Sequence, residues 1–145
     1  MTYRDRIACE ATSDNLGALL AFVERSCTAA ALDPEDAFAV RLSLEEICAN
    51  VITHGYAGRV GADRPISIDF MSCAEEVVAT IEDRATTFDP ANGPAPRLTG
   101  DAMERNIGGV GLHLVRSLMD EVRHEPLAGG GNRLTLVKRR VAATT

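Results

Sequence analysis

The helical pattern that organises this chain is clearest in residues 42–56, which read LSLEEICANVITHGY. Four apolar residues recur at the alternating spacing of three and four that builds one buried helix face: Val40, Leu44, Ile47 and Val51. Glu46 and Asn50 follow one turn apart on the flank of that face, so their side chains point the same way. A carboxylate and a carboxamide beside a core form either an ordinary contact on a helix flank or a functional pair, and for an isolated pair the ordinary contact is favoured.

Local signals set the limits of this helix. Asp33 can cap it and Pro34 suits its first position, where the missing N–H costs nothing. The helix is therefore predicted to begin near residue 34 and to end near Tyr56, where glycines break the pattern. An earlier amphipathic helix is predicted to run to about residue 31, with Ser13 or Asp14 as its N-cap.

Alternating apolar and polar residues predict strands on either side of the helices. The predicted strands cover residues 3–11, 65–71, 76–82, 121–125 and 132–138, and the second and third form an antiparallel hairpin. Asp83 stands at the end of the third strand. The element order is then strand, two helices, two strands, long loop, helix and two strands, which predicts a two-layer α/β sandwich with helices on one face of a mixed, mostly antiparallel sheet.

The long loop, residues 84–107, holds three prolines, two glycines and little apolar content. A loop of this length is either a lid or binding loop or a disordered insertion. It ends at residues 108–111, GGVG, directly before an apolar helical segment. A glycine-rich turn that opens a helix offers backbone N–H groups to an anion, typically a phosphate, although such a cluster alone is more often a hinge.

Composition narrows the class of protein. A chain of 145 residues predicts one domain over residues 1–145, and four scattered cysteines without a Cys-x-x-Cys pair favour reduced, buried thiols. The net charge of -6 and the absence of tryptophan argue against nucleic acid as a partner. No signal core or long apolar run is present, so we expect a cytoplasmic protein that does not enter a membrane.

The order of these motifs resembles the Bergerat (GHKL) ATP-binding domain shared by gyrase, histidine kinases and MutL. Within that superfamily, the chain is similar to anti-sigma-factor serine/threonine kinases of the RsbW and SpoIIAB type. The resemblance covers about residues 10–140 and rests on five features of the sequence: Glu46-x-x-x-Asn50, the run Asn50-x-x-x-His54-Gly55-Tyr56, Asp83 with Phe88-Asp89-Pro90, Gly108-Gly109-x-Gly111-Leu112, and Asn132-x-Leu134-x-Leu136.

The resemblance implies ATP and Mg²⁺ as cofactors. It implies that Asn50 is the metal ligand, that Glu46 is the general base toward the acceptor hydroxyl or water, and that Asp83 accepts a hydrogen bond from the adenine amino group. Further nucleotide contacts are implied around a lid at about residues 88–108: Ala85, Arg105, Gly108, Gly109, Val110, Gly111, Leu112 and Thr135. Arg105 can meet a phosphate or remain a solvated lid residue, and Thr135 is placed near the adenine.

One position departs from the family pattern. The family has Asp-x-Gly where this chain has Asp83-Arg84-Ala85. Alanine disfavours positive φ and adds a methyl group near the nucleotide, so we expect either weaker affinity or a reshaped loop. The site itself is expected to remain competent for ATP.

Three functions fit the resemblance. The first is a protein kinase that phosphorylates a STAS-domain anti-sigma-factor antagonist and sequesters a sigma factor or equivalent target. The second is a nucleotide-dependent binding module without phosphotransfer, and the third is an interaction protein with a relic ATP fold. An intact Glu46 favours the first over the second, and Asn50 argues against the third. The sheet face away from the helices is either solvated or the contact of a homodimer.

Overall fold

A single antiparallel sheet forms the base of the fold in a computed structural model of the chain, which describes residues 2–56, 63–85 and 111–141. The strands of the described residues lie in the order β1-β2-β3-β5-β4, and each neighbouring pair is antiparallel. Their bounds are β1 (Tyr3–Glu10), β2 (Pro65–Ser72), β3 (Glu76–Asp83), β4 (Glu121–Pro126) and β5 (Asn132–Arg139).

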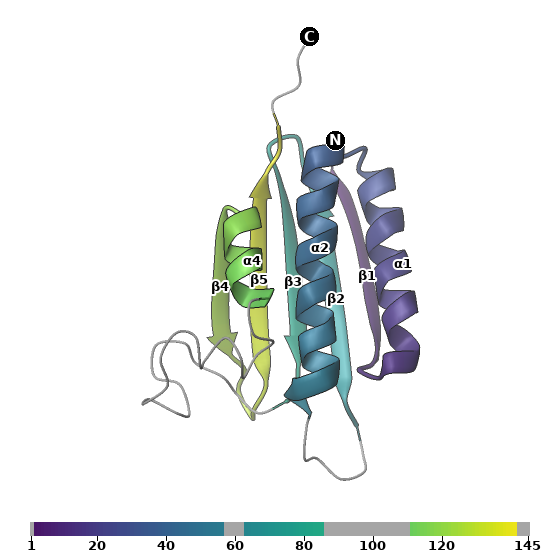
Figure 1. The fold of residues 1–145 in the computed structure, drawn as a ribbon, viewed down its shortest axis with the longest axis vertical. Coiled ribbons are helices and arrows are strands. Elements are labelled where there is room, and N and C mark those ends of the chain that lie inside the picture. The colour runs from purple at the N-terminus through teal and green to yellow at the C-terminus, as the bar shows by residue number, and fades with distance from the viewer. Residues whose placement is uncertain (1, 57–62, 86–110, 142–145) are drawn as a thin grey trace.

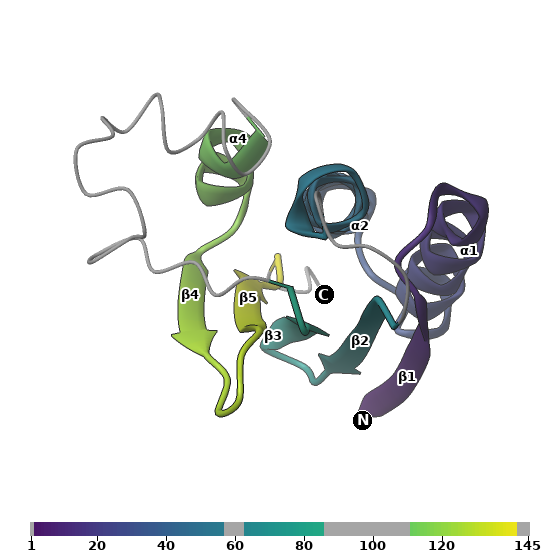
Figure 2. The same ribbon diagram turned by 90° about the horizontal axis from the view of Figure 1, so that it is seen from below.

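Three helices of the described residues cover one face of this sheet (Figures 1 and 2). They are α1 (Ser13–Ala29), α2 (Pro34–Asn50) and α4 (Gly111–Leu118). Figure 2 shows the helices on one side of the sheet, with the other face left open. The predicted two-layer sandwich and its element order are confirmed. No helix in residues 2–56, 63–85 and 111–141 is long and apolar enough to span a membrane.

The core lies between the helices and the sheet. The expected face of α2 is buried, with Val40, Leu44 and Ile47 each no more than 3% exposed. Residues that alternate along the strands meet this face, as period-two alternation requires. The fully buried large side chains include Leu19, Phe22, Val23, Ile66, Ile68, Phe70, Val77, Ile81, Val115 and Leu136.

The helix boundaries follow their capping signals with two differences. Asp33 caps α2 as expected, because its Oδ1 accepts a hydrogen bond from the Glu35 N–H at 3.1 Å. The N-cap of α1 is Thr12, in an extended conformation without a side-chain cap bond, and Ser13 is already helical. The last turn before Tyr56 is a π-helix, η1 (Val51–Gly55), rather than a continuation of the α-helix. Such widened turns frequently mark functional sites.

Candidate functional site

Glu46 and Asn50 lie in the final turns of α2, at the end of the helix that reaches the last residues of β3 (Figure 1). Both residues are half-buried, whereas Ile47 between them is buried in the core. A polar pair on the flank of a core helix is thus present as the sequence predicts. The roles of Glu46 as base and Asn50 as metal ligand stay predictions.

Cys48 lies between these two residues in the chain but does not share their chemistry. Its side chain is fully buried, and this burial, with a smaller effect of Cys9, raises the pKa of the thiol to about 12. A thiol with this pKa stays protonated at neutral pH, so Cys48 is a packing residue and not a nucleophile.

Asp83 is the last residue of β3 and is 6% exposed. Its Oδ1 accepts two hydrogen bonds, from the Ala85 N–H at 2.9 Å and from the Asn132 Nδ2 at 3.0 Å. A buried carboxylate needs such donors, because burial without hydrogen bonds is costly. Together they define the orientation of the Asp83 carboxylate at the end of the strand.

Tyr56 connects the helix that carries Glu46 and Asn50 to the strand that carries Asp83. The phenol group donates a hydrogen bond to the Pro65 carbonyl oxygen at 2.5 Å and accepts one from the Arg84 N–H at 2.7 Å. The ring is 3% exposed. Since Arg84 directly follows Asp83, this side chain relates the two halves of the predicted site. Tyr56 was predicted as the end of the helix and as part of a motif, but these contacts were not.

Ala85 adopts a backbone conformation that alanine tolerates. Among the described residues, Ala31 is the one non-glycine residue with positive φ, so Ala85 carries no strain of the kind expected from its departure from the family pattern. Its side chain is 3% exposed, and a Cβ placed on Gly55 would lie 3.4 Å from the Ala85 Cβ. The extra methyl group therefore packs against the glycine at the end of η1. Its effect on nucleotide affinity stays a prediction.

The strand register separates Thr135 from Asp83, and the predicted contact of Thr135 with the nucleotide stays a prediction. Thr135 pairs with Thr80, whereas Asp83 pairs with Asn132. Because side chains alternate between the two faces of a strand, Thr135 and Asp83 point to opposite faces of the sheet. The β5 residue beside Asp83 is Asn132, which the sequence analysis used only as a family motif.

A second residue that sequence reasoning missed is His124 on β4. Its Nε2 lies 2.8 Å from the Asn132 Oδ1. His124 and Asn132 are diagonal neighbours across the β4 and β5 strands, because His124 pairs with Leu134. Only the register of two strand pairs, β3 with β5 and β4 with β5, brings Asp83, Asn132 and His124 into one row, so no local signal pointed to it.

The remaining predicted contacts fall largely on the loop. Arg105, Gly108, Gly109 and Val110, with the lid predicted at residues 88–108, lie outside the described residues. Gly111 begins α4. Leu112 is 6% exposed and belongs to the hydrophobic core, so its side chain serves packing.

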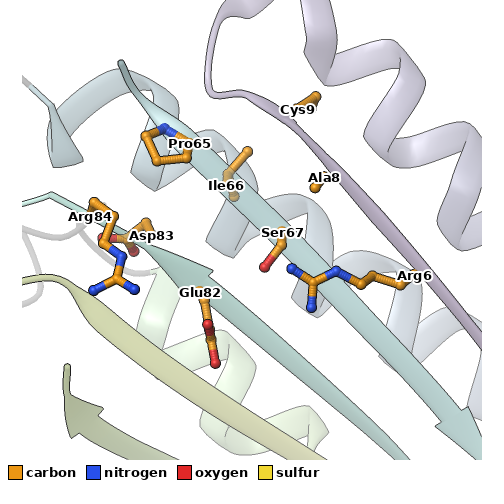
Figure 3. Close-up of a pocket in the computed structure, with 9 residues that line it drawn as sticks. All are labelled: Arg6, Ala8, Cys9, Pro65, Ile66, Ser67, Glu82, Asp83 and Arg84. Carbon is orange, nitrogen blue, oxygen red and sulfur yellow. The ribbon is translucent and has the colours of Figure 1, made fainter. Parts of the chain in front are cut away.

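The open face of the sheet carries a small hollow at the same end of β3 (Figure 3). Its volume is about 190 Å³, below the range of about 300–1,000 Å³ typical of ligand pockets. The labelled Arg6, Ser67 and Glu82 come from three neighbouring strands (Figure 3). Ion pairs cross this face between Arg6 and Asp69 at 3.0 Å and between Arg133 and Glu82 at 2.6 Å.

Comparisons with known proteins give the family and the fold of the chain. The family described as the histidine kinase-like ATPase domain matches residues 9–138. The serine-protein kinase RsbW of Bacillus pumilus is 27% identical over 94 residues, which cover 62% of this chain and 58% of that protein. The RsbW of Bacillus licheniformis is 31% identical over 91 residues, which cover 58% of this chain and 54% of that protein. The chain thus matches little more than half the length of these relatives.

A solved structure shares the fold over nearly the whole chain. The crystal structure of the RsbU and RsbW domains of Rv1364c from Mycobacterium tuberculosis matches with a TM-score of 0.63 and 21% identity, over 99% of this chain and 34% of that one. The fold shared with that structure is an antiparallel sheet covered on one face by helices. The chain belongs to the histidine kinase-like ATPase domain family.

Proposed function

We propose that this chain binds ATP with Mg²⁺ and transfers the γ-phosphoryl group to a serine or threonine of a partner protein. The observation that carries the proposal is the link between the end of α2 and the end of β3. Tyr56 holds the Arg84 N–H at 2.7 Å, and the Asp83 carboxylate next to it is buried and oriented by two donors. The residues proposed to bind the adenine and those proposed to bind the phosphates are therefore different but lie in one region of the fold.

The chemistry assigns one task to each polar residue. Asp83 accepts a hydrogen bond from the adenine amino group, which distinguishes adenine from guanine. Asn50 offers an amide oxygen to Mg²⁺. Proteins typically bind this ion through one or two side-chain ligands, and phosphates and waters supply the other ligands. Asn50 would hold the ion where, when bound, it would neutralise charge that develops on the transferred phosphoryl group.

Glu46 takes the proton of the acceptor hydroxyl. The hydroxyl oxygen then forms the new bond to the γ-phosphorus, the bond to the β-phosphate oxygen breaks, and ADP leaves with that electron pair. The half-exposed position of Glu46 on the flank of α2 suits a base that must reach an incoming protein side chain. Cys48, although two residues further along the chain, has no part in this step.

The partners follow from the relatives rather than from the site. Two relatives are named serine-protein kinase RsbW. By this likeness, the acceptor is a STAS-domain anti-sigma-factor antagonist, and the second partner is a sigma factor or an equivalent target. The competing function is a binding module that switches partners with nucleotide but transfers no phosphate.

Nucleotide binding is tested first by thermal unfolding with ATP, ADP and GTP, with and without Mg²⁺. Ligand at 100 times its dissociation constant adds about 2.7 kcal/mol to the free energy of unfolding. We expect ATP and ADP, but not GTP, to raise the midpoint of thermal unfolding. In Asn50→Ala this rise should no longer depend on Mg²⁺. If no nucleotide shifts the midpoint at millimolar concentration, the proposed site is wrong.

Phosphotransfer is tested with γ-labelled ATP and purified STAS-domain antagonists from the same genome. Glu46→Gln should bind ATP normally but transfer no label. The matched control is Glu45→Gln, because Glu45 is the adjacent carboxylate but is exposed. Transfer by Glu46→Gln at the wild-type rate would exclude Glu46 as the base. ATP binding without transfer by the wild type would favour the binding module.

A further inference from the structure

A row of three polar side chains crosses the end of the sheet from β4 to β3. The Asn132 Nδ2 lies 3.0 Å from the Asp83 Oδ1, and the Asn132 Oδ1 lies 2.8 Å from the His124 Nε2. Asn132 is 8% exposed and Asp83 is 6% exposed, whereas His124 is half-buried. The row therefore runs from a partly solvated imidazole to a buried carboxylate.

The donors and acceptors of these three side chains allow one arrangement of hydrogen bonds along the row. An ionised carboxylate only accepts hydrogen bonds, so Asn132 must present its NH₂ group to Asp83. The amide oxygen of Asn132 then faces His124, and an oxygen needs a donor. The Nε2 of His124 must therefore carry a hydrogen.

The alternative tautomer breaks the row. A neutral imidazole with its hydrogen on Nδ1 has an acceptor at Nε2, which would draw the NH₂ group of Asn132 toward itself. Rotation of the amide would then place its oxygen against the Asp83 carboxylate, where two acceptors repel. The tautomer of His124 thus decides whether Asn132 supports or displaces Asp83.

We propose that His124 is a positioning residue for adenine recognition, because its Nε2–H fixes the amide of Asn132 and through it the Asp83 carboxylate. This inference rests on the proposed function of Asp83 toward the adenine amino group. His124 acts through Asn132 and has no part in phosphotransfer. Their effect is on discrimination between bases.

The test compares two nucleotides that differ at one group. ADP carries the 6-amino group, and purine riboside 5′-diphosphate lacks it. The dissociation constant of purine riboside 5′-diphosphate divided by that of ADP therefore isolates the contact with Asp83. A hydrogen bond to a charged group predicts a ratio of about tenfold or more in the wild type. We expect His124→Leu to lower the ratio by about fivefold, mainly because it weakens the binding of ADP. His124→Gln should keep the ratio, because glutamine retains a hydrogen-bond donor.

A control on the same strand separates positioning from general damage. Arg123 pairs with Thr135, so it lies on the opposite face of β4, and its side chain is 64% exposed. Arg123→Leu should leave the ratio unchanged. In an Asp83→Asn background, His124→Leu should have no further effect on the ratio, whereas a purely structural role would lower affinity for both nucleotides equally.

The wild type supplies an independent measurement, which does not depend on the folding of a variant. The ¹⁵N chemical shifts of the His124 ring should show a protonated Nε2 in the neutral form. An Nδ1–H tautomer, or an unchanged ratio in His124→Leu, would overturn the inference while the proposed function stands. If the wild type binds neither nucleotide, the proposed function fails and the inference fails with it.

Discussion

The Tyr56 hydroxyl provides the sharpest test of how the site is assembled. Tyr56→Phe keeps the buried ring and removes one oxygen, which bonds to the Pro65 carbonyl at 2.5 Å and to the Arg84 N–H at 2.7 Å. A typical hydrogen bond contributes about 0.5–1.5 kcal/mol net, and a buried group left without a partner costs about 1–3 kcal/mol. Both bonds are only partly buried, so the expected loss in the free energy of unfolding is about 2 kcal/mol.

Equilibrium unfolding in urea, followed by circular dichroism, measures this loss. At about 2–4 °C per kcal/mol for a chain of this size, the thermal midpoint should fall by about 4–8 °C. ADP affinity should fall as well, because Arg84 follows Asp83 directly. Exchange of the Arg84 amide hydrogen should accelerate in the same variant.

The chain contains a matched control in Tyr3, the other of its two tyrosines. The Tyr3 hydroxyl makes an exposed bond to Asp5 at 3.4 Å. Tyr3→Phe removes the same atom and should change the free energy of unfolding by less than about 0.5 kcal/mol. If the Tyr56→Phe and Tyr3→Phe variants have the same free energy of unfolding, the Tyr56 hydroxyl does not hold the end of α2 to β3, and this account of how the site is assembled is refuted.

Two further predictions concern a turn and the buried thiols. Gly131→Ala should destabilise the chain by more than Gly129→Ala in urea unfolding. Both glycines have positive φ, but a Cβ on Gly131 would clash with the Asp83 carbonyl oxygen, whereas one on Gly129 meets nothing within 4 Å. The left-handed conformation alone costs alanine about 1–2 kcal/mol, so equal losses would contradict the close approach. Burial raises the pKa of Cys27 to about 11 and that of Cys48 to about 12, from 9.0. The unfolded chain therefore loses these protons first, and the thiols' stabilisation should be complete below pH 9 and decrease as the pH rises toward 11. A double Cys27→Ala, Cys48→Ala variant should show a shallower decrease, and an identical slope would count against the raised pKa values.

Most of the secondary structure was predictable because its signals are local. Asp33 and Pro34 mark the start of α2, and period-two alternation marks β2 and β3. The π-turn of η1 was not predictable in this way, since the apolar spacing into Val51 is that of an ordinary helix. Its geometry accompanies the hydrogen bonds of Tyr56 to residues of β2 and beyond β3.

The candidate site was predictable in part for the same reason. The positions of Glu46, Asn50 and Asp83 in the fold were predictable, because each stands at a recognisable place in one element. That Thr135 and Asp83 lie on opposite faces of the sheet was not predictable, because a side chain's face depends on which residue it pairs with and not on its distance along the chain. The β5 residue that pairs with Asp83 is Asn132.

The sequence by itself determined the order of the elements, the polar flank of α2 and the aspartate at the end of β3, because spacing and capping act between residues a few positions apart. The tertiary structure alone decided that Asp83 meets Asn132, which is 49 residues away, and that His124 and Tyr56 complete these contacts. Strand register sets such pairs, and register is fixed when the whole apolar face of the sheet packs against the helices. A shift of one residue would turn Asn132 to the open face and bring its neighbour to Asp83.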